Sequence, residues 1–330
     1  MSAVLQPVGD IERHLYIGSG DAASIMRVSK WRTRLDTYLA KVEPQKSNLA
    51  DPDRERIFRR GHKLEPYILE MLVDALRDAG HQVEFVARNE RYRHPDHPFL
   101  AAEIDGELVV DGVHVNAEAK SVNRRNHDEW GEEGTDQIPI YYAAQVAFAQ
   151  AVTGRRETWL GAIFGLDDVV MYHIVADDEL NGTIVSECVD FWHNHVVPRV
   201  PPEPETLVDL ARMYRTSGPP PVEATQEVAW AARRLMEIRA ERSRLEKDAE
   251  QAEFAIGAYM GESDTLLWQG KKILGFKHEP RMLIDGKRLE REQSDIYHQY
   301  QRASISRPIR IARNWDGLNV QNPKDQGEPE

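Results

Sequence analysis

The order of secondary structure in the first ~200 residues limits the fold more than any other feature of the sequence. Three runs, HQVEFVA (81–87), FLAAEIDGELVV (99–110) and VHVNAEAKS (113–121), alternate apolar with polar residues, as half-buried strands do. The dipeptide Asp111-Gly112 separates the last two and is typical of a hairpin turn. A helix is predicted before these strands, over residues 53–80, and another after them, over residues 138–152.

Two more strands and a helix complete this region. The runs ETWLGAIFG (157–165) and VVMYHIV (169–175) are typical of strands, and a helix is expected to begin near Asp177. Pro66 either kinks the helix of residues 53–80 or marks its true start, and Gly80 can end it in a left-handed cap. The first ~200 residues therefore predict an α/β fold, a mixed central sheet flanked by helices.

The remainder of the chain has a different character. Two proline-dense runs, VPRVPPEPE and SGPPPVE, predict a boundary between residues 200 and 222. From Val228 to Tyr259 apolar residues recur at alternating spacings of three and four, which predicts a coiled-coil-like helix of about 35 residues that needs a partner. We expect a domain of residues 1–215, a linker of 216–222, this helix within 223–262, a small α/β segment of 263–314 and a disordered tail of 315–330.

Composition excludes several classes of protein. The only cysteine, Cys188, cannot form an internal disulfide, a four-thiolate zinc site or a cysteine-ligated iron–sulfur cluster, so any metal must be held by oxygen or imidazole ligands. The net charge of −13 argues against a large nucleic-acid surface but permits a local one. Charges interrupt every apolar run before membrane length, and no secretion signal is visible at the N-terminus. We expect a soluble, non-secreted protein.

Strand periodicity places chemically active side chains together. The even positions from His114 to Lys120 are polar and include Glu118, whereas the odd positions are apolar. The same alternation over residues 99–105 puts Asp105 on a polar face, so the predicted hairpin would bring Asp105 near Glu118, with Lys120 beside them. Alternation alone favours a plainer interpretation, in which these residues form the solvated outer face of an edge hairpin.

Two polar residues on predicted helices favour a functional site over a solvated hairpin face. Glu65 shares a helix face with three leucines, and Gln145 shares one with Tyr141, Phe148 and Val152. Each alone could be a hydrogen-bonded polar group of the core. If Glu65, Asp105 and Glu118 converge, however, carboxylates ~4 Å apart repel each other by roughly 4 kcal/mol at an effective dielectric near 20. A divalent cation, Mg²⁺ or Mn²⁺, would remove that cost, since both prefer oxygen ligands.

These pieces resemble a known family. The runs RGHKLEPYI, AAEIDG, AEAKS and IPIYYAAQVAFAQAVTG, in this order, are similar to those of the YqaJ-like viral recombinases, relatives of phage lambda exonuclease with a PD-(D/E)XK restriction-endonuclease-like fold. The resemblance covers about residues 14–200. It implies catalytic roles for Glu65, Asp105, Glu118, Lys120 and Gln145. It also implies a Mg²⁺ site, with Mn²⁺ as a possible substitute, formed by Asp105, Glu118 and the main-chain carbonyl of Ala119.

Candidate DNA contacts lie near the start of the chain. The family's opening motif resembles G-A-S-D-A-A, whereas here it is GSGDAAS, with Gly20 at the usual serine position and Ser19 before it. No acid occurs between Met26 and Leu35, and we count Ser19, Arg27, Lys30 and Arg32 as candidate DNA-binding residues. A solvated helix end is the alternative interpretation of the three cations.

The resemblance implies a function. It predicts a metal-dependent 5′-3′ exonuclease on linear double-stranded DNA in phage-type homologous recombination, in the cytoplasm of a bacterial host cell. Expected partners are DNA, through duplex ends, a single-strand-annealing recombinase and further copies of the chain, but no membrane. The alternatives are an endonuclease on the same fold, a module that binds DNA without cutting it, and a coiled-coil adaptor built on residues 228–259.

Overall fold

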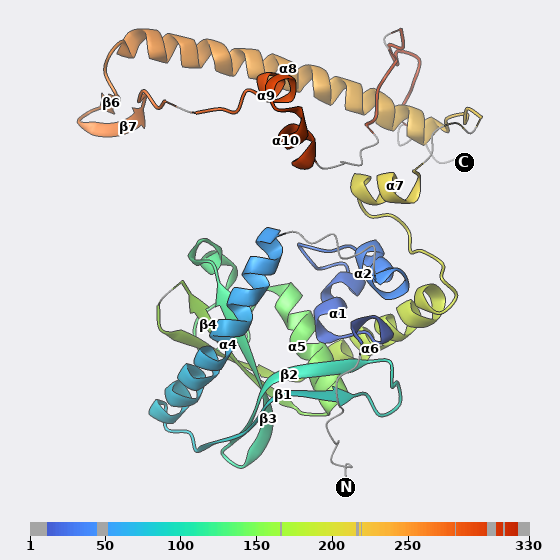
Figure 1. The fold of residues 1–330 in the computed structure, drawn as a ribbon, viewed down its shortest axis with the longest axis vertical. Helices are drawn as coiled ribbons and strands as arrows, with labels where there is room; N and C mark the ends of the chain where they lie inside the picture. The colour runs from blue at the N-terminus through green and yellow to red at the C-terminus, as the bar shows by residue number, and fades with distance from the viewer. Residues whose placement is uncertain are drawn as a thin grey trace, which may run out of the picture. The chain divides into compact units, whose positions relative to one another are not determined.

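A computed structural model of the chain describes residues 12–44, 52–165, 167–215, 218, 220–280, 282–301, 308–312 and 314–322 (Figure 1). Within residues 52–55 only the backbone is described. The chain divides into two compact units, Met1–Met213 and Tyr214–Glu330. The finer divisions expected in the C-terminal part stay predictions. Residues 323–330 of the expected tail, and residues 216, 217 and 219 of the expected linker, lie outside the described residues.

Unit 1 is built on a five-stranded sheet in which the strands follow the order of the sequence. All neighbouring strands are antiparallel except β3 and β4, which are parallel. A parallel pair needs a long crossover, and this one contains helix α5 (Ile140–Thr153). The predicted mixed α/β sheet is therefore confirmed. Its strands are β1 (Val83–Arg93), β2 (Ala101–Val110), β3 (Val113–Val122), β4 (Glu157–Phe164) and β5 (Val169–Val175).

The predicted turn between β2 and β3 is also confirmed. Asp111 and Gly112 have φ values of 51° and 83°. Two consecutive left-handed residues characterise the tight turn that matches the twist of a hairpin. This turn fixes the register of β2 against β3, and that register sets which side chains meet farther along the two strands.

Helices α4 (Pro52–Asp78) and α5 cover opposite faces of the sheet, and α4 crosses it diagonally in Figure 1. Leucines of α4 pack on Leu108, Val115 and Ala117, while Val146 of α5 packs on Leu160 and Ala162. Pro66 lies inside α4, so it does not mark the start of this helix. Gly161 faces α4, where a Cβ would lie 3.2 Å from that of Leu72. The missing side chain lets the helix pack closely on the sheet.

A second layer of helices packs around α5. Helices α1 (Ser19–Ile25), α2 (Arg34–Val42) and α6 (Asp178–Phe191) contribute to a core cluster that contains Ile25, Leu35, Phe148 and Phe191. A π-helical turn, η3 (Trp192–Val196), follows α6, and α7 (Leu207–Met213) ends the unit. Two 3-10 turns, η1 (Arg13–Leu15) and η2 (Arg124–Glu129), precede α1 and α5 respectively.

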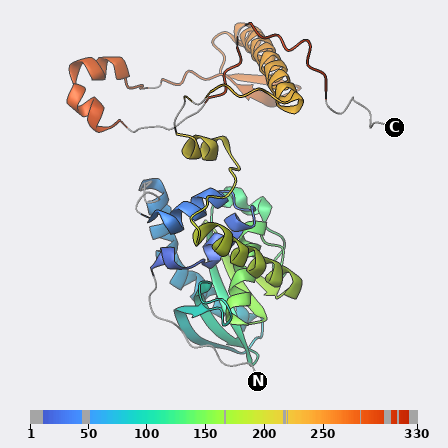
Figure 2. The same cartoon turned by 90° about the vertical axis from the view of Figure 1, so that its right-hand side faces the viewer.

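The described residues of unit 2 form a long helix, a hairpin and two short helices (Figure 2). The predicted long helix is present as α8 (Gln226–Met260). Its apolar positions are largely exposed, among them Val228, Leu245 and Tyr259. Strands β6 (Thr265–Trp268) and β7 (Lys271–Gly275) form the hairpin, and α9 (Gly286–Glu292) and α10 (Ser294–Gln299) follow. Among the described helices, none has the length and apolar character that a membrane span requires.

Candidate active site

The site begins where the pairing of β2 with β3 ends. The antiparallel register runs from Val110 opposite Val113 to Gly106 opposite Ala117, and Asp105 is the next residue on β2. Its Oδ2 atom accepts a hydrogen bond of 2.9 Å from the main-chain N–H of Ala119. Beyond the last backbone pair of β2 and β3, the carboxylate of Asp105 therefore binds the backbone of β3. This hydrogen bond fixes the carboxylate beside Glu118.

Glu118, Lys120 and Gln145 form a closed triangle of hydrogen bonds. Glu118 and Lys120 are two residues apart on β3, so their side chains leave the same face of the sheet. Oε1 of Glu118 accepts a hydrogen bond of 2.6 Å from Nε2 of Gln145 and a second from Nζ of Lys120. Nζ of Lys120 also donates to Oε1 of Gln145, at 3.2 Å. Helix α5 thus supplies the group that holds both strand residues.

Glu65 approaches the same place from α4. Its side chain is 16% exposed, and its Oε2 atom lies 3.6 Å from Nδ1 of His62. Burial raises the pKa of Glu65, and the charges of Glu118 and Glu103 act in the same direction, while His62 opposes them. Glu65 and Glu118 therefore influence each other electrostatically, from two elements that are distant in sequence.

The charge balance of the site favours a bound cation. Burial raises the pKa of Asp105 well above its usual value, and the neighbouring charge of Glu118 adds to this, whereas Lys120 and the Ala119 N–H lower it. Burial alone would lower the pKa of Lys120, but Glu118 and Asp105 outweigh it and raise the pKa. Lys120 is thus a cation that compensates only part of the carboxylate charge.

The residues present fit a divalent cation that takes oxygen ligands. In the described part of the chain, no group of three His, Cys, Asp or Glu side chains is arranged to hold a metal. A cation at Asp105 and Glu118 would then complete its ligands with a main-chain oxygen, as predicted for Ala119, and with water or substrate. The hydrogen bonds of the Glu118 carboxylate to other described residues fall on Oε1, which leaves Oε2 for such a role.

An aromatic group that the sequence analysis missed lies beside Lys120 and contacts it through one ring. The ammonium of Lys120 lies 5.0 Å from the ring centroid of Tyr142, and this ring contacts that of Tyr141 at 4.6 Å. Trp31 is 58% exposed and meets Tyr141 edge-on at 4.7 Å. One signal was available: Tyr142 stands three residues before Gln145 on the same helix, so the two side chains share a face.

The candidate DNA contacts have different neighbours in the structure. Lys30 lies 5.1 Å from the centroid of the Tyr141 ring and forms an ion pair of 2.5 Å with Glu129. Arg27 pairs with Glu205 at 3.0 Å. Ser19 begins α1, and its buried hydroxyl has no hydrogen-bond partner among the described residues. Their role in binding DNA stays a prediction.

Arg32 belongs to a buried ionic cluster that the sequence did not indicate. Asp21 is 1% exposed and contacts Arg13 at 2.9 Å, Lys41 at 2.7 Å and Arg32 at 3.1 Å. Burial alone would raise the pKa of Asp21, but the three cations lower it below its usual value. Burial lowers the pKa of Lys41 to about 8. The cluster ties α1 to α2 and to the segment that precedes α1.

Comparison with known proteins agrees with the motifs. Residues 11–156 match the model of the YqaJ-like viral recombinase domain. The chain is 28% identical to the uncharacterized protein YqaJ of Bacillus subtilis (strain 168) over 189 residues, which are 57% of this chain and 55% of that protein. The match thus spans about half the length of this curated relative.

Solved structures give weaker similarities. An alkaline exonuclease from Laribacter hongkongensis, LHK-Exo, is 20% identical with a TM-score of 0.42, over 55% of this chain and 88% of that one. Its complex with dAMP gives 19% and 0.43 over the same shares, and the structure of SSO0001 gives 13% and 0.32 over 56% and 79%. The resemblance predicted from the motifs is confirmed by the family model, which matches residues 11–156 to the YqaJ-like viral recombinase domain.

Proposed function

We propose that this protein is a metal-dependent deoxyribonuclease of phage-type recombination. The observation that carries the proposal is the triangle of Glu118, Lys120 and Gln145 beside the half-buried carboxylate of Asp105. Two carboxylates and one lysine on adjacent strands, β2 and β3, provide oxygen ligands for a cation and a positive charge for a phosphate oxygen. The match to the YqaJ-like viral recombinase domain supports the same activity.

Each residue of the site has its own role in the proposed hydrolysis of phosphodiesters. Asp105 and Glu118, with the carbonyl of Ala119, would hold Mg²⁺, or Mn²⁺ in its place. Such a cation activates water and stabilises charge on a transferring phosphoryl group. Lys120 keeps its proton at neutral pH because Glu118 and Asp105 raise its pKa, so it donates to a phosphate oxygen and does not act as a base. Gln145 positions Lys120 and Glu118.

We further propose that the enzyme is a 5′-3′ exonuclease that enters linear duplex DNA at its ends. A single-strand-annealing recombinase would receive the strand that it exposes, and a homo-oligomer would keep the substrate attached between cuts. The net charge of −13 supports enclosure of the DNA in preference to a large open basic surface. The nearest alternative, an endonuclease on the same fold, would use the same residues.

A cleavage assay on two substrates tests the proposal. The full-length protein is incubated with Mg²⁺ and either a 5′-end-labelled linear duplex or a covalently closed circle, with and without a chelator. We expect loss of the linear duplex from its 5′ ends, an intact circle, and no cleavage with chelator. Rapid nicking of the circle would favour the endonuclease, and no metal-dependent cleavage of either substrate would reject the nuclease.

A further inference from the structure

Residues 265–278 of unit 2 form a positively charged hairpin in an acidic protein. This hairpin comprises β6, β7 and the next three residues, Phe276, Lys277 and His278. It contains three lysines, Lys271, Lys272 and Lys277, and no acid. Helix α8, which precedes it, has seven acids and six basic residues along its length. The positive charge of the hairpin is therefore local, and it stands apart from the mixed charge of α8.

The lysines of the hairpin differ from many other cations of this chain because no acid among the described residues pairs with them. On α8 and α9, Arg233, Arg242, Arg244 and Arg288 each lie within 3.4 Å of a glutamate oxygen. Of the candidate DNA contacts of unit 1, the three cations Arg27, Lys30 and Arg32 also have acidic partners. Within the described part of the chain, none of the three hairpin lysines forms an ion pair. Their charge is available to an external anion.

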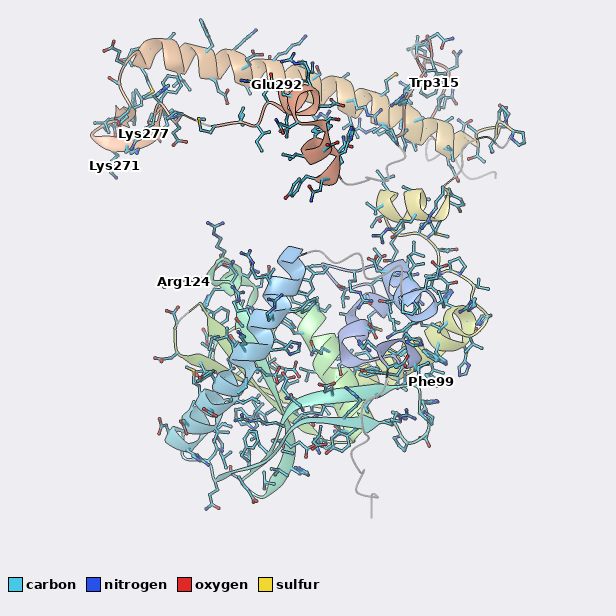
Figure 3. The ribbon with its side chains drawn as sticks, viewed as in Figure 1. Phe99, Arg124, Lys271, Lys277, Glu292 and Trp315 are labelled. Carbon is cyan, nitrogen blue, oxygen red and sulfur yellow. The ribbon has the colours of Figure 1, made fainter. Side chains whose placement is uncertain are left out.

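The hairpin presents these lysines on a regular frame. Gln269 and Gly270 have φ values of 51° and 78°, which make a tight turn. Trp268 pairs with Lys271 across the strands, and Leu267 pairs with Lys272, so one lysine lies on each face. Lys271 and Lys277 are both seen on this hairpin in Figure 3. The side chain of Trp268 at the turn is 67% exposed.

The base of the hairpin contacts α8 through Phe276. The ring of Phe276 lies over Gly257 of α8, 3.4 Å from where a Cβ on that glycine would stand. The N–H of Phe276 donates a hydrogen bond of 2.9 Å to the carbonyl of Asp264, which closes the base of the hairpin. Trp268 and Lys271 pair at the other end of the hairpin, next to its turn. The two-stranded element that carries the lysines thus contacts the long helix at its base.

We propose that this hairpin is a second DNA-binding element, separate from the catalytic site. A two-stranded ribbon fits the major groove of duplex DNA, and lysines on both faces would meet the phosphates of both walls if the tip enters first. Trp268 offers a ring on which an unpaired base can stack. The inference relies on the proposed function only for the choice of DNA as the polyanion.

A pair of matched triple variants tests the proposal. The hairpin variant is K271Q/K272Q/K277Q, and the control is R242Q/R244Q/R288Q, which removes the same charge from three exposed arginines of unit 2 that already have acidic partners. Circular dichroism checks that both full-length variants fold. Binding of a fluorescent duplex is measured by anisotropy in chelator, so that no cleavage occurs, between 50 and 200 mM salt.

Salt dependence gives the expected result. Each lysine–phosphate contact adds about 0.9 to the steepness with which log affinity falls against log salt concentration. Three contacts therefore multiply the loss of affinity across this fourfold salt range by about 40. We expect the hairpin variant to bind the duplex more weakly at 50 mM salt and to lose the share of the salt slope that the three lysines contribute. The control should keep the affinity and the salt slope of the wild type. Equal binding by the two variants, or no binding by the wild type, would overturn the proposal.

Trp268→Ala separates stacking from charge. We expect its affinity for a single-stranded oligonucleotide to fall at least about fivefold with an unchanged salt slope, because stacking involves no counterion release. Unchanged affinity would remove Trp268 from the site. Cleavage by the same variants in Mg²⁺ keeps the two proposals distinct. If the wild type does not cleave DNA but its binding still depends on the lysines, the nuclease proposal is rejected and the DNA-binding role of the hairpin stands. If cleavage is normal and the lysine variant binds as the wild type does, the hairpin proposal is rejected and the nuclease proposal stands.

Discussion

The side-chain amide of Gln145 lies 2.6 Å from Oε1 of Glu118 and also accepts a hydrogen bond from Lys120. One residue of α5 thus fixes two residues of β3. Because Lys120 also contacts Glu118 directly, the carboxylate and the ammonium are held together by hydrogen bonds within the protein. This arrangement places a positioning residue beside the proposed ligands, and it makes the function of the site testable one side chain at a time.

Gln145→Ala should slow cleavage without unfolding the protein. Loss of the amide frees both Glu118 and Lys120, and loss of groups that orient metal ligands costs about 10- to 100-fold in activity or metal affinity. Gln150→Ala is the matched control, since Gln150 is buried on the same helix but bonds to Thr158 and to the carbonyl of Ile174. Cleavage rates and melting temperatures of both variants show whether Gln145 positions the site or only stabilises the fold. If the two lose activity equally at equal stability, Gln145 has only a structural role.

Lys120→Met should separate the chemical step from metal binding. The ammonium cannot be a metal ligand, so we expect the maximal cleavage rate to fall steeply. The Mg²⁺ concentration for half-maximal rate should stay the same or fall, because a positive charge leaves the neighbourhood of the carboxylates. A Mg²⁺ titration of the cleavage rate measures both quantities. A rise in the required Mg²⁺ that accounts for the whole loss would contradict the role given to Lys120.

Asp21→Asn should destabilise unit 1 and change its response to acid. Removing one partner of a buried ion pair costs about 3–5 kcal/mol, and here it leaves Lys41 buried without its acid. The pKa of Asp21 is lowered in the folded protein, so its contribution to stability is complete above the usual carboxyl pKa near 4 and is lost as the pH falls below it. The variant should therefore lose less stability than the wild type on acidification from pH 4.

Denaturant unfolding at pH 7 and through the acid range measures this effect. Asp178→Asn is the control, since Asp178 pairs with Arg156 at an exposed site, where an ion pair contributes at most about 1 kcal/mol. Equal destabilisation by the two variants would show that the cations around Asp21 do not stabilise the fold as the structure indicates.

Local spacing predicted most of the sheet and half of the candidate site. Alternation over residues 113–120 placed Glu118 and Lys120 on one strand face, and the Asp111-Gly112 turn set the register toward Asp105. These features depend on periods of two residues and on one turn, so they can be read from the sequence. The end of the β2–β3 ladder at Gly106 could not be read, although it explains how Asp105 reaches the Ala119 N–H.

Ion pairs between distant segments escaped prediction. Arg27 and Lys30 look like free cations in the sequence, but their partners, Glu205 and Glu129, lie 178 and 99 residues away. Lys41 belongs to a residue type that is mostly exposed in proteins, but here its side chain is buried against Asp21. Such pairs depend on how helices pack in three dimensions, and no local pattern reports that packing. The heptad-like spacing of α8 likewise predicted the helix but not what covers its exposed side chains.

Glu118→Gln tests the central claim most directly. The substitution keeps the size of the side chain and an oxygen that can accept from Gln145 and Lys120, but it removes the charge that would bind the metal. With Mg²⁺ and an end-labelled linear duplex, we expect the cleavage rate to fall more than about 100-fold, beyond the effect of losing an orienting group, while the melting temperature stays close to that of the wild type. Wild-type cleavage by this variant would contradict the assignment of Glu118 and Asp105 as the metal-binding pair.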